Sequence, residues 1–259
     1  VSSTATQMPR LIGLAQASKI YRNSKIKKAK KFSNNGDEIA WGTIGNASTS
    51  EGLFFEAINT AGVLQIPMII SVWDDGYGIS VDNKQQTTKE SISKALSGFA
   101  REDDMGIEIL NVKGWDYSSL IKTYNYASKI AREKHIPVLV HVTELTQPLG
   151  HSTSGSHERY KSKERLQWEK EHDCNFKFRE WIISNGISDE EYLNKIESDI
   201  KTQVKEAKNN AWKAYQKPIF SQRNQLNKFL EAFMTQSNND VELKILHKNL
   251  NEKTELFFH

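Results

Sequence analysis

The sequence predicts an α/β fold in which helices cover both faces of a parallel sheet, followed by a helical C-terminal extension. Two observations support this prediction. Helix-like and strand-like segments alternate through the first 150 residues, which is typical of βαβ units with right-handed crossovers. From about residue 163 onward, the apolar residues recur at helical spacing only.

Four segments of the first half have the length and apolar content of strands, and three others have apolar residues at helical spacing. The run at 66–73 is apolar throughout, which favours a strand that is covered on both faces. Ser50 is expected to cap the helix that follows it. We expect strands at 37–45, 66–73, 107–112 and 137–142, and helices at 9–21, 50–64 and 116–134.

The composition changes at residues 145–160, which are polar, contain Gly and Pro, and are expected to form a loop. A helical pattern then runs from Asp189 to Tyr215, and Pro218 is expected to end it. One or two amphipathic helices should follow, around a break at 237–240. The expected division is an N-terminally truncated α/β domain (1–160), C-terminal helices packing on it (161–218), and a helical linker or the start of a beta-like domain (219–259).

Composition argues against several classes of protein. Hydrophobic residues make up 37% and charged residues 26%, as in a globular protein. The 35 basic and 32 acidic residues are interspersed, so we expect no nucleic-acid partner. The single cysteine, Cys174, cannot form an intramolecular disulfide, which favours a cytoplasmic location. No apolar run approaches the roughly 20 residues that span a bilayer, so no membrane partner is expected.

Two polar loops follow the ends of two predicted strands. They are G-N-A-S-T-S-E-G at 45–52 and W-D-D-G-Y-G-I-S at 73–80. Ligands of parallel sheets bind at the carboxyl ends of the strands, and a Gly-containing turn before a helix exposes N–H groups to an anion. Each loop alone resembles a common turn. Together they predict a site for a diphosphate with Mg²⁺, because the second loop supplies two carboxylates.

The order and spacing of these loops resemble the thiamine diphosphate signature. The pattern G-x-A-x-x-S-E-G-x-x-x-E-A-x-N precedes D-D-G-Y-G-I-S, and 26 residues (48–73) separate G-N-A from D-D. The segment L-G-H-S-T-S-G-S-H-E-R-Y-K-S at 149–162 resembles an active-site loop of the same family. Over residues 1–218 the chain resembles the alpha subunit of the decarboxylating first component of 2-oxo acid dehydrogenase complexes, closest to the branched-chain type. The resemblance implies the thiamine-diphosphate-binding fold.

By position, the resemblance implies a metal site. Asn46, Asp75 and the backbone carbonyl of Tyr77 would bind Mg²⁺. The family has an acid at the first of these positions and N-N where this chain has D-D. The amide and the acid are therefore exchanged between the two loops, and the formal charge beside the metal is unchanged.

The resemblance also implies contacts with the cofactor. The backbone N–H groups of Ala47 and Ser48 would face the diphosphate of thiamine diphosphate, with Gly45 and Ile79 beside it. His151 would reach the phosphate and the reacting centre, and is the expected catalytic residue. Ser152 lies at the position that is phosphorylated in some relatives. The chain departs from the family at Trp73, which stands where branched-chain relatives have an Arg.

The function implied is oxidative decarboxylation of a branched-chain 2-oxo acid, with acyl transfer to lipoyl groups. The expected partners are a beta subunit or beta-like half that completes the active site, and a lipoyl-bearing acyltransferase, in a homo-oligomer or an alpha–beta assembly. The glutamate that activates the cofactor would lie in the beta half, so the isolated chain should be inactive. Two alternatives stay open: a degenerate scaffold that only holds a partner, and a nucleotide-binding α/β enzyme.

Overall fold

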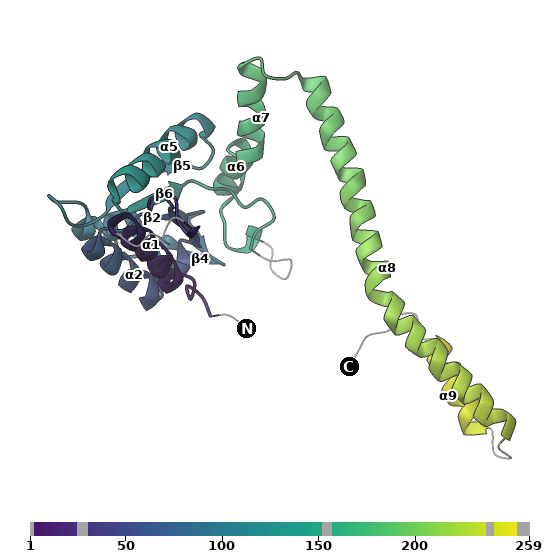
Figure 1. Ribbon diagram of the computed structural model, residues 1–259. Helices are drawn as coiled ribbons and strands as arrows, with labels where there is room; N and C mark the ends of the chain where they lie inside the picture. Colours follow the sequence, from purple (N-terminus) through teal and green to yellow (C-terminus); the bar gives the residue numbers. More distant parts are fainter. Residues whose placement is uncertain (1–2, 25–30, 152–156, 237–240, 253–259) are drawn as a thin grey trace. The chain divides into compact units, whose positions relative to one another are not determined.

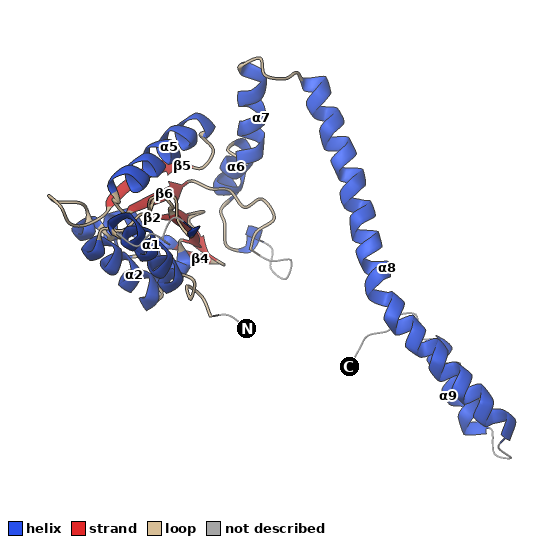
Figure 2. Cartoon of the chain, viewed as in Figure 1, coloured by secondary structure: helices blue, strands red, loops and turns tan. Residues whose placement is uncertain are grey.

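The computed structural model describes residues 3–24, 31–151, 157–236 and 241–252 (Figure 1). The chain divides into two compact units, residues 1–187 and 188–259, and each is considered by itself. The first unit holds a four-stranded parallel sheet flanked by helices, and the second is helical (Figure 2). The predicted fold class is therefore confirmed. The predicted division at residues 160 and 218 stays a prediction.

The sheet consists of four parallel strands, β1 (Ala40–Gly45), β2 (Met68–Trp73), β5 (Glu108–Lys113) and β6 (Val138–Thr143). Their order across the sheet is β1-β2-β6-β5. Gly45 pairs with Trp73, and Trp73 pairs with Val142, so three strands end side by side. The loops that leave these three strands consequently start at one edge of the sheet.

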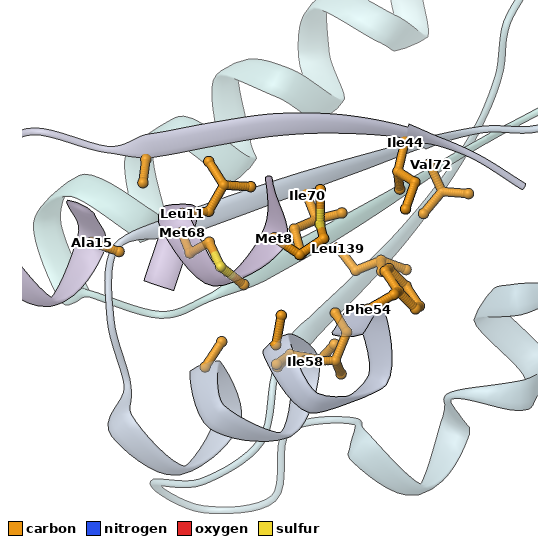
Figure 3. Close-up of a cluster of buried hydrophobic side chains, with 14 of the residues drawn as sticks. Met8, Leu11, Ala15, Ile44, Phe54, Ile58, Met68, Ile70, Val72 and Leu139 are labelled. Carbon is orange, nitrogen blue, oxygen red and sulfur yellow. The ribbon is translucent and has the colours of Figure 1, made fainter. Parts of the chain in front are cut away.

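Helices cover both faces of this sheet, because alternate side chains of each strand point to opposite faces. On one face, α1 (Met8–Asn23) and α2 (Gly52–Leu64) pack over Met68, Ile70 and Val72 of β2 (Figure 3). On the other face, α5 (Tyr117–Lys134) packs over a second cluster that contains Ile69. The strand at 68–73 is therefore covered on both sides, as its apolar run predicts. The first cluster includes Met8, Leu11, Ala15, Ile44, Phe54, Ile58 and Leu139 (Figure 3).

A run of short elements joins β2 to β5. A two-stranded antiparallel ribbon of β3 (Tyr77–Gly78) and β4 (Val81–Asp82) leads into the one-turn helix α3 (Asn83–Gln86). The Asp82 side chain caps α3 by accepting a hydrogen bond from the Lys84 N–H group. This ribbon holds Asn83 beside the first loop, which matters for the site. The elements that complete the connection are η3 (Thr88–Glu90), α4 (Ile92–Ala95) and η4 (Ser97–Phe99).

The start of α2 differs from the prediction. Ser50 does not cap it, because residues Ala47–Ser50 form a separate 3-10 helix, η2. The Thr49 N–H group donates to Asn46 O and the Glu51 N–H group donates to Ser48 O, so Ser50 lies inside that turn. Glu51 occupies the N-cap position of α2 without a side-chain capping bond.

The predicted end of the long helix at Pro218 is wrong. After η5 (His157–Arg159), α6 (Lys163–Glu171) and α7 (Cys174–Ser184) close the first unit, and α8 (Glu190–Gln236) continues through Pro218. A proline inside a helix removes one hydrogen bond and costs about 3 kcal/mol, which a 47-residue helix can accommodate. The helix α9 (Val241–Glu252) packs on α8 through an Asn227–Asn251 side-chain pair.

Within the described residues, no helix is long and apolar enough to cross a membrane. The cytoplasmic location expected from the single cysteine stays a prediction. Ser152 and the predicted break at 237–240 lie outside the described residues.

Candidate functional site

All eight residues singled out from the sequence line one cavity of about 660 Å³ in the first unit. The cavity lies where β1, β2 and β6 end, since its walls come from the loops that follow those strands. The sequence places these residues up to about a hundred positions apart, and the fold gathers them at one sheet edge. The structure shows that these residues lie close together, and their roles stay predictions. They are Gly45, Asn46, Ala47, Ser48, Asp75, Tyr77, Ile79 and His151.

The first loop is fixed at Asn46. Its N–H group donates to Trp73 O at 3.0 Å, and its carbonyl accepts from the Thr49 hydroxyl at 2.6 Å. The 3-10 helix η2 starts with the bond from Thr49 N–H to Asn46 O. The N–H groups of Ala47 and Ser48 precede that bond and have no partner within the helix. They are therefore placed to bind an acceptor in the cavity.

The second loop is a tight turn built by its two carboxylates. Asp74 Oδ1 accepts from the Gly76 N–H group at 2.8 Å, and Asp75 Oδ1 accepts from the Tyr77 N–H group at 3.1 Å. Gly76 has a φ of 85°, a conformation in which a side chain is strained. This turn brings the Tyr77 carbonyl to 3.1 Å from Asn46 Nδ2.

The two loops pack closely at Gly78. A Cβ atom at this position would lie 2.9 Å from Ala47 Cβ and 2.5 Å from Gln86 Oε1. A larger residue would therefore push the second loop away from η2. Glycine at 78 keeps the expected metal ligands and the expected diphosphate contacts on one cavity.

A hydrogen-bond network that is not predicted from the sequence lies beside Asn46. Asn46 Nδ2 donates to Asn83 Oδ1 at 2.9 Å, and Asn83 Nδ2 donates to Asp74 at 3.0 and 3.3 Å. Asp74 Oδ2 in turn lies 2.8 Å from Nε2 of His141, whose Nδ1 lies 2.9 Å from Ser93 Oγ. Two members of this network are visible in the sequence: Asp74 belongs to the D-D pair of the second loop, and His141 is the one ionisable side chain inside the apolar run of β6.

The pKa values of the two adjacent aspartates, Asp74 and Asp75, are shifted in opposite directions. Burial pushes the pKa of Asp74 up, but hydrogen bonds from His141, Gly76 and Asn83 outweigh it and leave that pKa below its ordinary value. Burial raises the pKa of Asp75, and the Tyr77 N–H group and the charge of Lys161 only partly offset the effect. The fold thus favours the ionised form of Asp74 and disfavours the ionised form of Asp75.

Helix α6 and the residues before it contact the second loop. Arg165 Nη2 donates to Asp75 O at 2.7 Å, and Arg165 and Lys161 each form a 2.8 Å ion pair with Glu169. Both cations also lie over the Tyr77 ring, at 5.1 Å for Lys161 Nζ and 5.6 Å for Arg165 Cζ. We call Lys161, Arg165 and Glu169 the α6 cluster. Lys161 and Glu169 are almost fully buried, so removing Glu169 would leave Lys161 without its ion-pair partner, whereas Glu169 is also paired with Arg165.

The described residues that line the cavity include no lysine or arginine. Trp73 is 54% exposed, and its Nε1 donates to Ser71 Oγ at 3.0 Å. His151 is exposed at the cavity, and the Tyr160 hydroxyl, whose pKa is raised by burial, interacts with the His151 backbone. Besides Trp73 and the eight predicted residues, the described residues that line the cavity are Thr4, Glu51, Gly78, Leu145, Thr146 and Gln147.

The donor set fits a hard cation that arrives with a diphosphate. Among the described residues, no cluster of three or more His, Cys, Asp or Glu side chains could hold a metal alone. One carboxylate, one amide and one backbone carbonyl supply three oxygen ligands at most. Mg²⁺ requires six, and typically takes the remainder from phosphates and water. The metal and the diphosphate should therefore bind together.

Comparisons with known proteins identify relatives of the first unit and the start of the second. The family described as "Dehydrogenase E1 component" matches residues 2–219. The mitochondrial 2-oxoisovalerate dehydrogenase subunit alpha 2 of Arabidopsis thaliana is 31% identical over 208 residues, which cover 79% of this chain and 39% of the relative. The pyruvate dehydrogenase E1 component subunit alpha of Staphylococcus aureus is 30% identical over 177 residues, which cover 64% of this chain and 44% of the relative. The chain thus spans less than half the length of these curated relatives.

Proposed function

The chain belongs to the dehydrogenase E1 component family, and from this premise we propose that it supplies the magnesium–diphosphate half of a thiamine diphosphate site in a 2-oxo acid dehydrogenase. Members of this family use thiamine diphosphate with a divalent metal, typically Mg²⁺. The observation that carries the proposal is the single cavity lined by all eight residues that the family pattern implies. The resemblance seen in the sequence is thereby confirmed at the level of the family.

The residues of this chain would divide the work of binding. Asn46 Oδ1, the Asp75 carboxylate and the Tyr77 carbonyl would hold Mg²⁺, while the Ala47 and Ser48 N–H groups would bind the diphosphate. His151, at the exposed side of the cavity, would contact the phosphate and the reacting substrate. When bound, thiamine diphosphate supplies the electron sink that decarboxylation of a 2-oxo acid requires.

The substrate we propose is a branched-chain 2-oxo acid, with transfer of the acyl group to a lipoyl-bearing acyltransferase. Two Arabidopsis thaliana relatives named 2-oxoisovalerate dehydrogenase alpha subunits, 31% and 28% identical, support this choice. Among the described residues, the carboxylates that line the cavity are Glu51 and Asp75, and the latter is a proposed metal ligand. A beta subunit or beta-like half would therefore contribute the acid that activates the cofactor.

This proposal predicts that cofactor binding requires the metal and that turnover requires the beta partner. Calorimetry should detect thiamine diphosphate binding with Mg²⁺ and beta partner present, and little or none with the metal omitted. Decarboxylation of 2-oxoisovalerate should appear only after the beta partner is added. Turnover by the chain alone would contradict the composite site.

A matched variant separates the cofactor site from general damage. His151→Ala should lower turnover at least about a hundredfold and leave Mg²⁺-dependent cofactor binding within a few-fold of the parent. Absence of cofactor binding under all of these conditions would instead indicate a scaffold that only holds a partner.

A further inference from the structure

We propose that Asp74 acts through Asn83 to orient the Asn46 amide, so that the amide oxygen and not the nitrogen faces the cavity. Asp74 and Asn83 are thus positioning residues for a candidate metal ligand. The inference rests on the proposed function only where a bound metal is concerned. The network itself is a property of the chain without any ligand.

The argument starts at Asp74, whose position and hydrogen-bonding direction are fixed. Its carboxylate is 6% exposed and accepts from the Gly76 N–H group at 2.8 Å. On its other oxygen it lies 2.8 Å from Nε2 of His141, which is itself 1% exposed. An ionised carboxylate has no hydrogen to donate. Any group that bonds to Asp74 must therefore present a donor.

Asn83 is the group that meets Asp74 from the cavity side. An amide has a donor end and an acceptor end, and these ends look alike in shape. Because Asp74 accepts only, the Asn83 nitrogen must face it, at 3.0 Å from Oδ1 and 3.3 Å from Oδ2. The Asn83 oxygen then points the other way, toward Asn46.

The same reasoning fixes Asn46. Two acceptors surround one end of its side chain, Asn83 Oδ1 at 2.9 Å and the Tyr77 carbonyl at 3.1 Å. Only the –NH₂ end can satisfy both, and it uses its two hydrogens to do so. The remaining atom, Oδ1, is the one available as an oxygen ligand at the cavity.

This orientation makes Asn46→Asp a decisive substitution. Counting charge alone, an added carboxylate should strengthen Mg²⁺ binding. The network predicts the opposite, because an aspartate would place an acceptor against two acceptors in a buried position. Asn83 cannot turn its amide to relieve the conflict, since its oxygen would then face Asp74.

The first test is a double-mutant cycle with Mn²⁺ as the probe. Binding is measured by electron paramagnetic resonance on the full chain with thiamine diphosphate and the beta partner present. Asn46→Asp should weaken Mn²⁺ binding about tenfold, and the same change in an Asn83→Ala background should weaken it by less than about threefold. Asn111→Asp, an exposed amide-to-acid change on β5, is the matched control and should have no effect.

The second test needs no metal. In chain labelled with ¹⁵N-asparagine, the side-chain amide signals of Asn46 report its hydrogen bonds. Asp74→Asn lets Asn83 turn, so the Asn46 amide signals should shift and lose their protection from exchange, although Asp74 does not touch Asn46. The parallel Asn111→Asp sample should leave those signals in place.

These readouts separate the two proposals. The orienting role is wrong if the parent binds Mn²⁺ but Asn46→Asp binds it equally or more tightly. It is also wrong if Asn46→Asp lowers the Mn²⁺ affinity by the same factor with and without Asn83→Ala. Unchanged Asn46 signals in Asp74→Asn contradict it as well. If the parent binds no Mn²⁺ at all, the proposed function fails, and the amide signals still decide whether the network exists.

Discussion

At the scale of single residues, the exchange of acid and amide between the two loops becomes a structural statement. Asn46 and Asp75 line the same cavity, from loops that follow neighbouring strands. The carboxylate therefore sits on the second loop, where burial raises its pKa. An ionised Asp75 is unfavourable in the chain alone and becomes favourable when a cation binds. If Asp75 binds the metal as we propose, its raised pKa is a cost that metal binding would relieve.

Asp75→Asn should consequently have opposite effects on metal binding and on stability. Mn²⁺ affinity should fall about tenfold or more, and by more than it falls in Asn46→Ala, because the only charged ligand is lost. The metal-free variant should be more stable than the parent at pH 7, because it no longer carries an uncompensated buried charge. Titration of Mn²⁺ and urea unfolding of the metal-free chain measure the two effects.

The sign follows from linkage. The folded chain holds the Asp75 proton more tightly than the unfolded chain, whose pKa is near the ordinary 3.8. The parent therefore loses stability relative to Asp75→Asn as the pH rises from that value through the raised pKa of the folded chain, and the gap is complete once the pH exceeds the folded pKa. A metal-free variant less stable than the parent at pH 7 would show that Asp75 is compensated after all.

At the scale of elements, the junction between α5 and β6 contains a second titrating group with a predictable effect. His135 ends α5 in the left-handed conformation, with a φ of 55°, and its Nε2 lies 2.9 Å from Gly36 O. It is 6% exposed, and burial lowers its pKa. Protonation of this imidazole therefore favours the unfolded chain.

Unfolding experiments should detect His135 as a loss of stability at mildly acidic pH. Because the folded pKa lies below the ordinary 6.5, the contribution is intact above that value and is lost as the pH falls through it. His135→Asn, which tolerates the left-handed conformation, should show a smaller loss between pH 7.5 and 5.5, a range of about two units around the ordinary histidine pKa. Equal pH dependence of urea unfolding in the two proteins would contradict the role of His135.

Elements with a strong apolar pattern were predictable from the sequence, and short elements were not. Strand β2 is apolar at every position except Ser71 and is predicted to within two residues, while the ribbon β3–β4 and helix α3 have two to four residues each. Asn83 lies at the start of α3, so its place beside Asn46 depends on a turn that no periodicity reveals. The continuation of α8 through Pro218 was missed because a local helix-breaking preference was outweighed by the surrounding helix.

The part of the site that could be predicted is the part that lies in sequence motifs. The eight predicted cavity residues belong to two motif loops and to the loop of His151, and these loops meet because parallel strands end at one edge of the sheet. The α6 cluster was not predictable, since Lys161, Arg165 and Glu169 resemble any charged helix surface in sequence. Burial turns them into a support for the second loop, and burial depends on the tertiary packing.

At the scale of the whole molecule, the first unit contains every described residue that lines the candidate site. Residues 1–187 include the two hydrophobic clusters that pack on the sheet. They also include the cavity and the α6 cluster. The sequence had predicted a boundary at residue 160, between the active-site loop and the helices. The structure gives a physical reason to place the end of the functional unit later, because α6 donates to Asp75 O through Arg165.

Two fragments distinguish these boundaries. Residues 1–187 should fold cooperatively, with a midpoint within about 5 °C of the full chain's first transition, since no part of either cluster is removed. They should also keep Mn²⁺ and thiamine diphosphate binding wherever the full chain shows it. Residues 1–160 lack the α6 cluster, so the loop of Asp75 and Tyr77 loses the Arg165 hydrogen bond and both cations over the tyrosine ring. This shorter fragment should melt at a lower temperature and bind Mn²⁺ at least about tenfold more weakly, because ligands that are not held in place bind a metal poorly. Equal binding by the two fragments would mean that the turn at Gly76 positions its carboxylate and carbonyl without help from α6.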